Sequence, residues 1–197
     1  MQTLAAEIIQ GRRLTRLDDL TPLLQAGLED LCAGADQIRK ALRGAGYELC
    51  TIINARSGRC GEDCTFCAQS CHHQTQAQEY PFLEVEEIVR QGKRDEAAGV
   101  QRYSLVTAGR AVTGPELDQA LAAYRRLREE TGLGLCASFG FQSVEDFRRL
   151  KEAGVTRYHA NLETSRRNFP NICTTHSYQD KIDNIRRARQ AGLQICS

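Results

Sequence analysis

The chain has 197 residues, of which 41% are hydrophobic and 26% charged, as in an ordinary globular protein with one sizeable core. Its 26 basic and 25 acidic residues leave a net charge of +1, which excludes the basic footprint of a nucleic-acid-binding protein. Because the sequence has no export signal and no membrane-spanning stretch, its nine cysteines indicate metal or cluster ligation in the reducing cytoplasm rather than disulfides.

The first part of the chain has the pattern of helices that precede a main fold. Apolar residues recur at helical spacing over 3–10 and again over 17–45, where leucines from Leu17 onwards share one face. We therefore expect two domains, an N-terminal helical extension over 1–46 and a core domain over 47–197.

From Gly46 onwards a glycine repeatedly precedes a strand-like run, as in Gly132-Leu-Gly-Leu-Cys136 and Gly192-Leu-Gln-Ile-Cys196. Each such glycine is expected to close an amphipathic helix in the left-handed conformation. The pattern predicts helices over 84–98, 114–131, 143–153 and 178–191, and strands that include 47–54, 101–107, 133–138 and 193–197.

Strands that alternate with helices form a parallel sheet. The repeat predicts an α/β fold, namely a TIM-type (β/α) barrel of which about five strands are present. The chain stops at Ser197 as the fifth strand ends. We therefore expect this to be an N-terminal portion of a longer protein with about three further βα units.

The loop after the first strand carries three cysteines at C-x3-C-x2-C spacing, which we call the loop cysteines: Cys60, Cys64 and Cys67. Three thiolates this close can hold three irons of a [4Fe–4S] cluster and leave the fourth iron open to a small molecule. A closed zinc site needs a fourth ligand, which His72 or His73 could supply, so zinc stays the alternative. The loop lies at the strand end where barrels carry their active sites.

An aromatic residue, Phe66, precedes the third loop cysteine, and this spacing resembles the radical S-adenosylmethionine superfamily. The flanking residues, CGEDCTFCAQS followed by two histidines, resemble its biotin synthase family. The resemblance implies reductive cleavage of S-adenosylmethionine at a [4Fe–4S] cluster on the loop cysteines, with Phe66 beside the cofactor. The resulting 5′-deoxyadenosyl radical takes hydrogen from dethiobiotin, and sulfur from an auxiliary iron–sulfur cluster then forms biotin. A flavodoxin- or ferredoxin-type electron donor and a homodimer are implied as partners.

The auxiliary cluster is where the sequence departs from this family. The family has cysteines on the strands that correspond to 101–107, 133–138 and 193–197, but Ser104 stands at the first position. Cys50 occupies the same slot in its strand as the cysteines of the other two, so the expected ligands are the strand cysteines Cys50, Cys136 and Cys196. This predicts a [2Fe–2S] cluster or a variant of it, with Cys173 as a reserve ligand. The alternative is that strand cysteines are small packing residues.

Further residues match the family one at a time. Asn161-Leu-Glu163 resembles the segment that ends strand four, which implies that Asn161 contacts substrate and S-adenosylmethionine and that Glu163 holds the ribose hydroxyls. His159 is expected to contact dethiobiotin, with a satisfied core histidine as the alternative. Lys181 matches an arginine that pairs with the methionyl carboxylate, although lysine lacks the bidentate fork. The strand end at Thr107 offers a backbone ledge for the same cofactor.

Two other functions remain open from the sequence. One is a radical enzyme of the hydrogenase-maturation or methylornithine-synthase type, against which the strand cysteines argue because only sulfur insertion needs a sulfur donor. The other is a truncated remnant that binds a cluster or zinc without turnover.

Overall fold

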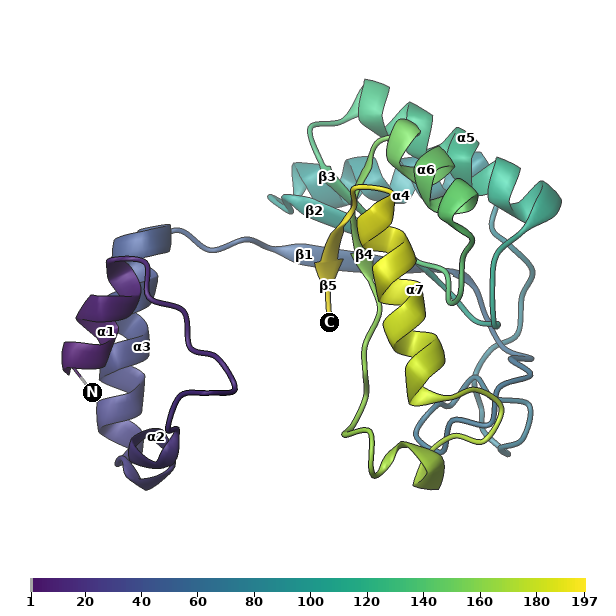
Figure 1. Cartoon of the computed structure of the whole chain (residues 1–197). Helices are drawn as coiled ribbons and strands as arrows, with labels where there is room; N and C mark the ends of the chain where they lie inside the picture. The colour runs from purple at the N-terminus through teal and green to yellow at the C-terminus, as the bar shows by residue number, and fades with distance from the viewer. Residues whose placement is uncertain (1) are drawn as a thin grey trace. The chain divides into compact units, whose positions relative to one another are not determined.

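The structure is a computed structural model that describes residues 2–197 (Figure 1). It divides into two units, one up to Tyr47 and one from Glu48 to Ser197. Among residues 2–197, no helix has the length and apolar character that crossing a membrane requires.

The N-terminal unit contains α1 (Gln2–Ile9), α2 (Thr21–Gln25) and α3 (Leu28–Arg43), with α1 packed on α3. The prediction of helices over 17–45 is confirmed by α2 and α3 but is wrong for residues 17–20, which lie outside any helix. The Asp18 carboxylate accepts hydrogen bonds from the Thr15 backbone N–H (2.6 Å) and hydroxyl (2.9 Å), a local turn that competes with helix formation. Leu17 is consequently outside any helix and 89% exposed. The extended backbone at Gly27 (φ −63°, ψ 147°) then separates α2 from α3.

The second unit is a partial (β/α) barrel whose five parallel strands follow one another in sequence order. Its strands are β1 (Cys50–Arg56), β2 (Arg102–Thr107), β3 (Gly134–Ser138), β4 (Val155–His159) and β5 (Gln194–Cys196). Its helices are α4 (Val85–Ala97), α5 (Gly114–Glu130), α6 (Val144–Glu152) and α7 (Tyr178–Gln190), with a short 3-10 turn η1 (Phe169–Asn171). The α/β barrel prediction is confirmed, although the first strand begins at Cys50 rather than at residue 47.

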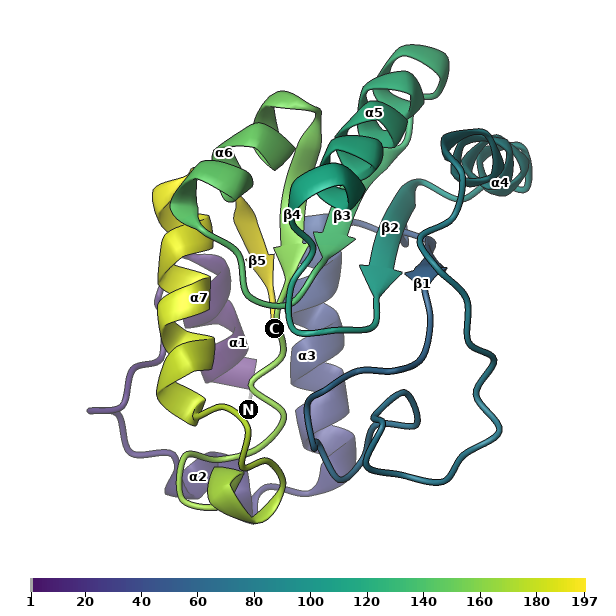
Figure 2. The same cartoon turned by 90° about the vertical axis from the view of Figure 1, so that its right-hand side faces the viewer.

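Helices α4 to α7 cover one face of this sheet (Figure 2). Two of them begin at serine caps, since the hydroxyls of Ser143 and Ser177 each accept a hydrogen bond from the backbone three residues on. Apolar residues from both layers fill the space between helices and sheet and are almost fully buried; they include Ile88, Leu121, Leu127, Phe147, Tyr103, Leu105, Leu135 and Tyr158.

The opposite face of the sheet is open, and we call it the inner face. Side chains alternate along a strand, so the residues between the core positions point to this side. The strand register pairs Cys50 with Arg102, Ser104 with Cys136, and His159 with Cys196, each pair on the inner face. All three strand cysteines therefore project from the same side of the sheet. The fold thus combines a packed outer face with a polar, sulfur-bearing inner face.

Candidate functional site

Parallel strands bring the loops after β1, β2, β3 and β4 to one end of the sheet. The loops after β2 and β3 are tied together there, because Ala111 and Gly140 form an antiparallel bridge. The backbone N–H of Phe141 also donates a hydrogen bond to the Arg110 carbonyl (2.8 Å). This end of the sheet carries the candidate site.

A cavity of about 340 Å³ opens at this end, and four of its lining residues were predicted from the sequence: His159, Asn161, Glu163 and Lys181. Residues that sequence reasoning missed complete the wall, and they include Ser138, Gly140, Phe141 and Asn184. Two predicted cofactor contacts lie outside the lining. Phe66 is 57% exposed, and the hydroxyl of Thr107 is buried without a hydrogen-bond partner among residues 2–197.

The polar groups of the cavity form two pairs. The Lys181 ammonium lies 3.8 Å from a carboxylate oxygen of Glu163, and His159 Nε2 lies 2.8 Å from Asn161 Oδ1. Glu163 adopts a left-handed backbone (φ +66°), a conformation that is costly outside glycine and is found preferentially at functional sites. An ammonium, a carboxylate and an amide in one cavity can bind both the charged and the hydroxyl groups of a polar ligand.

The loop cysteines are held by backbone hydrogen bonds of a loop that folds back on itself. The Cys60 N–H donates to the Gln69 carbonyl (2.9 Å), the Cys71 N–H donates to the Cys60 carbonyl (2.8 Å), and the Cys67 N–H donates to the Cys64 carbonyl (3.0 Å). Cys60 is buried, whereas Cys64 and Cys67 are half-buried. The loop therefore holds three thiols on a closed turn.

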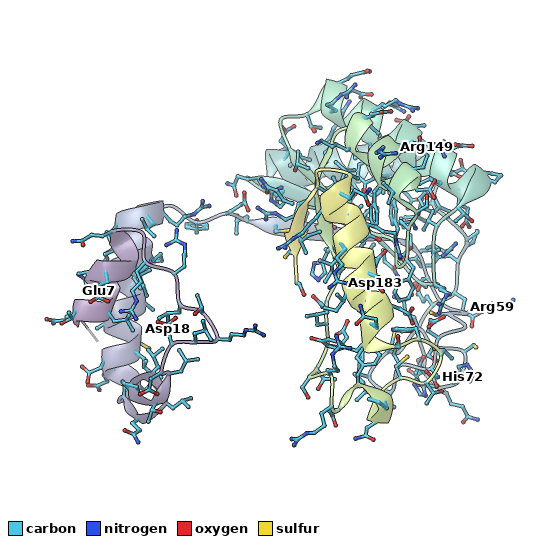
Figure 3. The ribbon with its side chains drawn as sticks, viewed as in Figure 1. Glu7, Asp18, Arg59, His72, Arg149 and Asp183 are labelled. Carbon is cyan, nitrogen blue, oxygen red and sulfur yellow. The ribbon has the colours of Figure 1, made fainter. Side chains whose placement is uncertain are left out.

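The two histidines that the zinc alternative requires point to backbone carbonyls instead. A ring nitrogen of His72 lies 3.2 Å from the Gly61 carbonyl, and a ring nitrogen of His73 lies 3.0 Å from the Cys64 carbonyl. Figure 3 shows His72 on the cysteine loop, at the edge of the second unit. In this arrangement neither histidine completes a zinc site on the loop cysteines.

A network that sequence reasoning missed connects the cysteine loop to the loop after β4. The Asp63 carboxylate accepts hydrogen bonds from the backbone N–H groups of Thr174 (2.9 Å) and Thr175 (3.2 Å). Glu62 accepts a hydrogen bond from the Thr175 hydroxyl (2.8 Å), pairs with Arg110 (3.0 Å) and contacts His176 Nδ1. These contacts fix the position of the cysteine loop over the end of the sheet.

The network shifts the pKa values of both carboxyl groups downward. Burial alone raises the pKa of Glu62, but hydrogen bonds from Thr175 and His176 and the charge of Arg110 outweigh it and lower the pKa. Hydrogen bonds from Thr174 lower the pKa of Asp63 well below its ordinary range. Both groups are therefore held as carboxylates at neutral pH.

Cys64 and Cys173 lie side by side beneath this network. Their sulfur atoms are 3.8 Å apart, and the Cys173 sulfur is 3.2 Å from His176 Nδ1. Burial raises the pKa of the Cys64 thiol to about 12, the Cys173 sulfur adds to this rise, and the positive charge of Lys181 opposes it. The cavity lysine thus lies within electrostatic reach of a loop cysteine.

The position of Cys173 bears on its predicted role. It contacts the cysteine loop, whereas its assignment as a reserve ligand of an auxiliary cluster stays a prediction. The sequence did contain a signal for the group formed by Cys64, Cys173 and His176. Cys173 and His176 have Cys-x2-His spacing, which is short enough for two ligands of one metal ion.

The strand cysteines lie on the inner face in different environments. Cys136 is buried, with its sulfur 3.6 Å from Arg102 Nη1, whereas Cys50 and Cys196 are exposed. Burial raises the pKa of the Cys136 thiol, the Arg102 guanidinium opposes this, and the Cys50 sulfur reinforces it. The sulfurs of Cys50 and Cys136 are therefore close enough to influence each other.

A partial (β/α) barrel with three loop cysteines and a cavity that carries a few charged and amide groups defines a class of enzyme that binds an iron–sulfur cluster and a small cofactor at the barrel mouth. The Radical SAM superfamily matches residues 54–197, which is most of the chain. The chain belongs to the Radical SAM superfamily.

Within this superfamily, several curated relatives are named biotin synthase. The protein from Clostridium beijerinckii is 58% identical over 197 residues, and the protein from Alkaliphilus metalliredigens is 53% identical over the same length. A third, from Akkermansia muciniphila, is 46% identical over 195 residues. The alignments cover 99–100% of this chain but only 60–62% of these relatives, so the chain spans about 60% of their length.

Solved structures of other radical enzymes share the fold. Methylornithine synthase superposes with a TM-score of 0.78 at 22% identity, covering 98% of this chain and 57% of that protein. HydG, a maturase of the [FeFe]-hydrogenase, superposes with a TM-score of 0.74 at 20% identity, covering 98% and 45% respectively. At these identities the likeness supports the fold alone.

Proposed function

We propose that the chain is part of a biotin synthase, which inserts sulfur into dethiobiotin with S-adenosylmethionine as the radical source. The names of relatives at 46–58% identity support this proposal. The structural observation that carries it is the set of three strand cysteines on the inner face, next to the cavity. Cys50 and Cys136 each precede a cavity-lining residue by two positions, and Cys196 pairs with the lining residue His159. Thiols at this position fit an enzyme that supplies sulfur from a cluster in the barrel.

The loop cysteines fit a [4Fe–4S] cluster. They offer three thiols from one closed loop, and the two nearby histidines contact backbone carbonyls, so one iron of the cluster is left for an external ligand. Such a cluster supplies the electron that cleaves the sulfonium bond of S-adenosylmethionine. The protein's own task is to place and shield the reactants.

The cavity residues provide that placement. Lys181 offers its ammonium to the methionyl carboxylate, and its charge already reaches the Cys64 thiol, which ties the cofactor end of the cavity to the cysteine loop. Glu163 takes the ribose hydroxyls in this assignment, and Asn161 lies between cofactor and substrate. The contact of His159 with Asn161 (2.8 Å) holds the imidazole at the cavity wall, where it can donate to or accept from dethiobiotin. Phe66 and Thr107 are peripheral contributors.

The strand register supports one shared layer for the strand cysteines. Along the hydrogen-bonded rows, Cys136 is level with Ile52 on β1 and with Gln194 on β5. Cys50 precedes Ile52 by two residues, and Cys196 follows Gln194 by two residues. From β1 to β3 and from β3 to β5 the cysteine position therefore advances by two residues over two strands, or about one residue per strand. Residues in one layer of an eight-stranded barrel with a shear of eight are displaced by this amount. We infer that these three thiols hold the auxiliary iron–sulfur cluster, a [2Fe–2S] cluster or a variant.

The test is sulfur insertion itself. The chain, alone and joined to the C-terminal part of the Clostridium beijerinckii relative, is reconstituted anaerobically and given dithionite, S-adenosylmethionine and dethiobiotin. We expect biotin and 5′-deoxyadenosine from the joined protein, and 5′-deoxyadenosine without biotin from its Cys136→Ala variant. If the joined wild type forms 5′-deoxyadenosine but no biotin, the proposal fails and a radical enzyme without sulfur insertion is favoured. The flavodoxin- or ferredoxin-type donor and the homodimer stay predictions.

A further inference from the structure

Three potential metal ligands meet where the cysteine loop touches the loop after β4. The sulfurs of Cys64 and Cys173 and a ring nitrogen of His176 all lie within 4.8 Å of one another. Cys173 is buried, and the side chain of His176 is only 3% exposed. Of the three residues, only Cys64 belongs to the loop cysteines.

The spacing of these atoms is that of ligands around one ion. The Cys64 and Cys173 sulfurs are 3.8 Å apart, and the Cys173 sulfur is 3.2 Å from His176 Nδ1 and 3.8 Å from Nε2. Tetrahedral zinc with Zn–S bonds of about 2.3 Å and Zn–N bonds of about 2.0 Å separates two sulfurs by about 3.8 Å, and a sulfur from a nitrogen by about 3.5 Å. Cysteines that ligate a cubane cluster instead bind different irons.

The surroundings of His176 prepare its ring for a metal. Glu62 contacts Nδ1 and, as a carboxylate, accepts a hydrogen bond from the N–H of that nitrogen, which leaves the lone pair on Nε2. Because Nδ1 is the ring nitrogen nearer to the Cys173 sulfur, the imidazole has to turn for Nε2 to bind an ion together with Cys173. A carboxylate that orients a histidine in this way is the usual partner of a metal-bound imidazole. Arg110 pairs with the same carboxylate (3.0 Å) and holds it in place. Asp63 Oδ1 lies 3.2 Å from the Cys173 sulfur and is the carboxylate oxygen nearest to that ligand.

We propose that Cys64, Cys173 and His176 form a mononuclear site for a divalent transition-metal ion, Zn²⁺ in the first instance. Binding releases one proton from each thiol to solvent, and the two thiolates balance the charge of the ion. The site goes beyond the proposed function, because it holds an ion when the cysteine loop carries no cluster. It also differs from the zinc alternative read from the sequence, which required His72 or His73.

The two metal centres exclude each other because both need the Cys64 sulfur. A chain that holds the ion has to release it from Cys64 before three loop cysteines can ligate a cluster. Zn²⁺ therefore slows cluster assembly in the wild type, and it does so less in a variant whose mononuclear site is weakened.

Cobalt is the probe for the site, because Co²⁺ takes the place of Zn²⁺ and gives thiolate charge-transfer absorption in the near ultraviolet. The full chain is freed of metal under anaerobic conditions and titrated with Co²⁺, and Zn²⁺ is then added in competition. We expect one Co²⁺ per chain with a tetrahedral spectrum in the wild type and in the Cys60→Ser/Cys67→Ser double variant. Circular dichroism checks that each variant is folded.

The discriminating variants are Cys173→Ser and His176→Gln, with His72→Gln as the matched control. Loss of a ligand or of its supporting partner commonly weakens metal affinity about 10- to 100-fold, and we expect a loss of at least that size for the first two and none for the control. The proposal is overturned if Co²⁺ affinity falls in the Cys60→Ser/Cys67→Ser variant and is unchanged in Cys173→Ser and His176→Gln.

Reconstitution with iron and sulfide separates this proposal from the proposed function. In the wild type, the rate at which the cluster absorbance develops is measured with and without Zn²⁺, and the same pair of measurements is made on His176→Gln. Inhibition by Zn²⁺ that is relieved in His176→Gln supports the mononuclear site. Equal inhibition of both proteins contradicts it, even where the cluster itself assembles normally. If the chain binds Co²⁺ as expected but assembles no iron–sulfur cluster, the result contradicts the proposed radical-enzyme function and leaves the mononuclear-site proposal supported.

Discussion

Replacement of Gly140 by alanine tests how closely the loops after β2 and β3 must approach to form the cavity. Gly140 lines the cavity and has φ +70°. An added Cβ would lie 2.1 Å from the carbonyl oxygen of Arg110 and 2.7 Å from its carbonyl carbon. Because both atoms belong to the backbone, no side-chain rotation relieves the overlap and the two loops have to separate.

The loss of stability in Gly140→Ala has two parts, and substitution of a second glycine measures one of them separately. A left-handed backbone costs an alanine about 1–2 kcal/mol, and forcing an extra methyl group into a packed site costs about 1–3 kcal/mol more. Gly99 has φ +89° but open space around its Cβ position, so Gly99→Ala pays only the first part. We expect Gly140→Ala to lower the free energy of unfolding by about 2–5 kcal/mol and Gly99→Ala by about 1–2 kcal/mol.

Urea unfolding of the two variants and the wild type, followed by circular dichroism, measures these differences. Equal losses in both variants would refute the close approach of the loops, because the left-handed backbone would then account for the entire effect. A larger loss in Gly140→Ala, accompanied by weaker S-adenosylmethionine binding after reconstitution, supports it.

Three further outcomes follow from the site. Lys181→Ala weakens S-adenosylmethionine binding to the reconstituted protein about tenfold or more, as expected for a lost charged hydrogen bond, whereas Lys181→Arg retains the affinity. Equal affinities of Lys181→Ala and the wild type in equilibrium dialysis would exclude this contact. The pKa of the Asp63 carboxyl is lowered on folding, so its stabilisation is complete above its ordinary pKa of about 4 and is lost as the pH falls below that value. Thermal melts of Asp63→Asn should therefore show a shallower loss of Tm below about pH 4 than the wild type, and parallel curves would contradict the assignment. Tyr158→Phe removes the acceptor of the Phe139 N–H (3.0 Å) in the core, which costs about 1–3 kcal/mol in urea unfolding; an unchanged midpoint would show that the amide finds another partner.

The barrel could be predicted because local pattern and topology suffice for it, and four of the residues that line the cavity could be predicted from the resemblance. Helix periodicity and glycine punctuation located the β/α units to within a few residues. The glycines at 99, 154 and 192 adopt positive φ as expected, whereas the prediction is wrong for Gly46 and Gly132, which do not. His159, Asn161 and Glu163 were predicted from the resemblance to the family, and the topology accounts for their place at the barrel mouth because parallel strands end at one edge. Lys181 was found only through the resemblance, and it lies 3.8 Å from Glu163.

The rest depends on contacts that no local pattern encodes. Glu62 and His176 are 114 residues apart in sequence and meet only because the loops after β1 and β4 share one end of the barrel. Topology brings the loops together but does not say which side chains touch. The helix pattern fails over residues 17–20 because the Asp18 carboxylate accepts a hydrogen bond from the Thr15 backbone N–H and so favours a local turn.

Iron and acid-labile sulfide content after anaerobic reconstitution tests the central claim, that the chain carries cysteines for two clusters, most directly. The wild type is compared with a variant in which all three loop cysteines are alanine, and with one that also lacks the strand cysteines Cys50, Cys136 and Cys196. We expect iron to persist in the first variant and to disappear in the second. Loss of all iron in the first variant would contradict the account, because the strand cysteines would then be packing residues without a cluster.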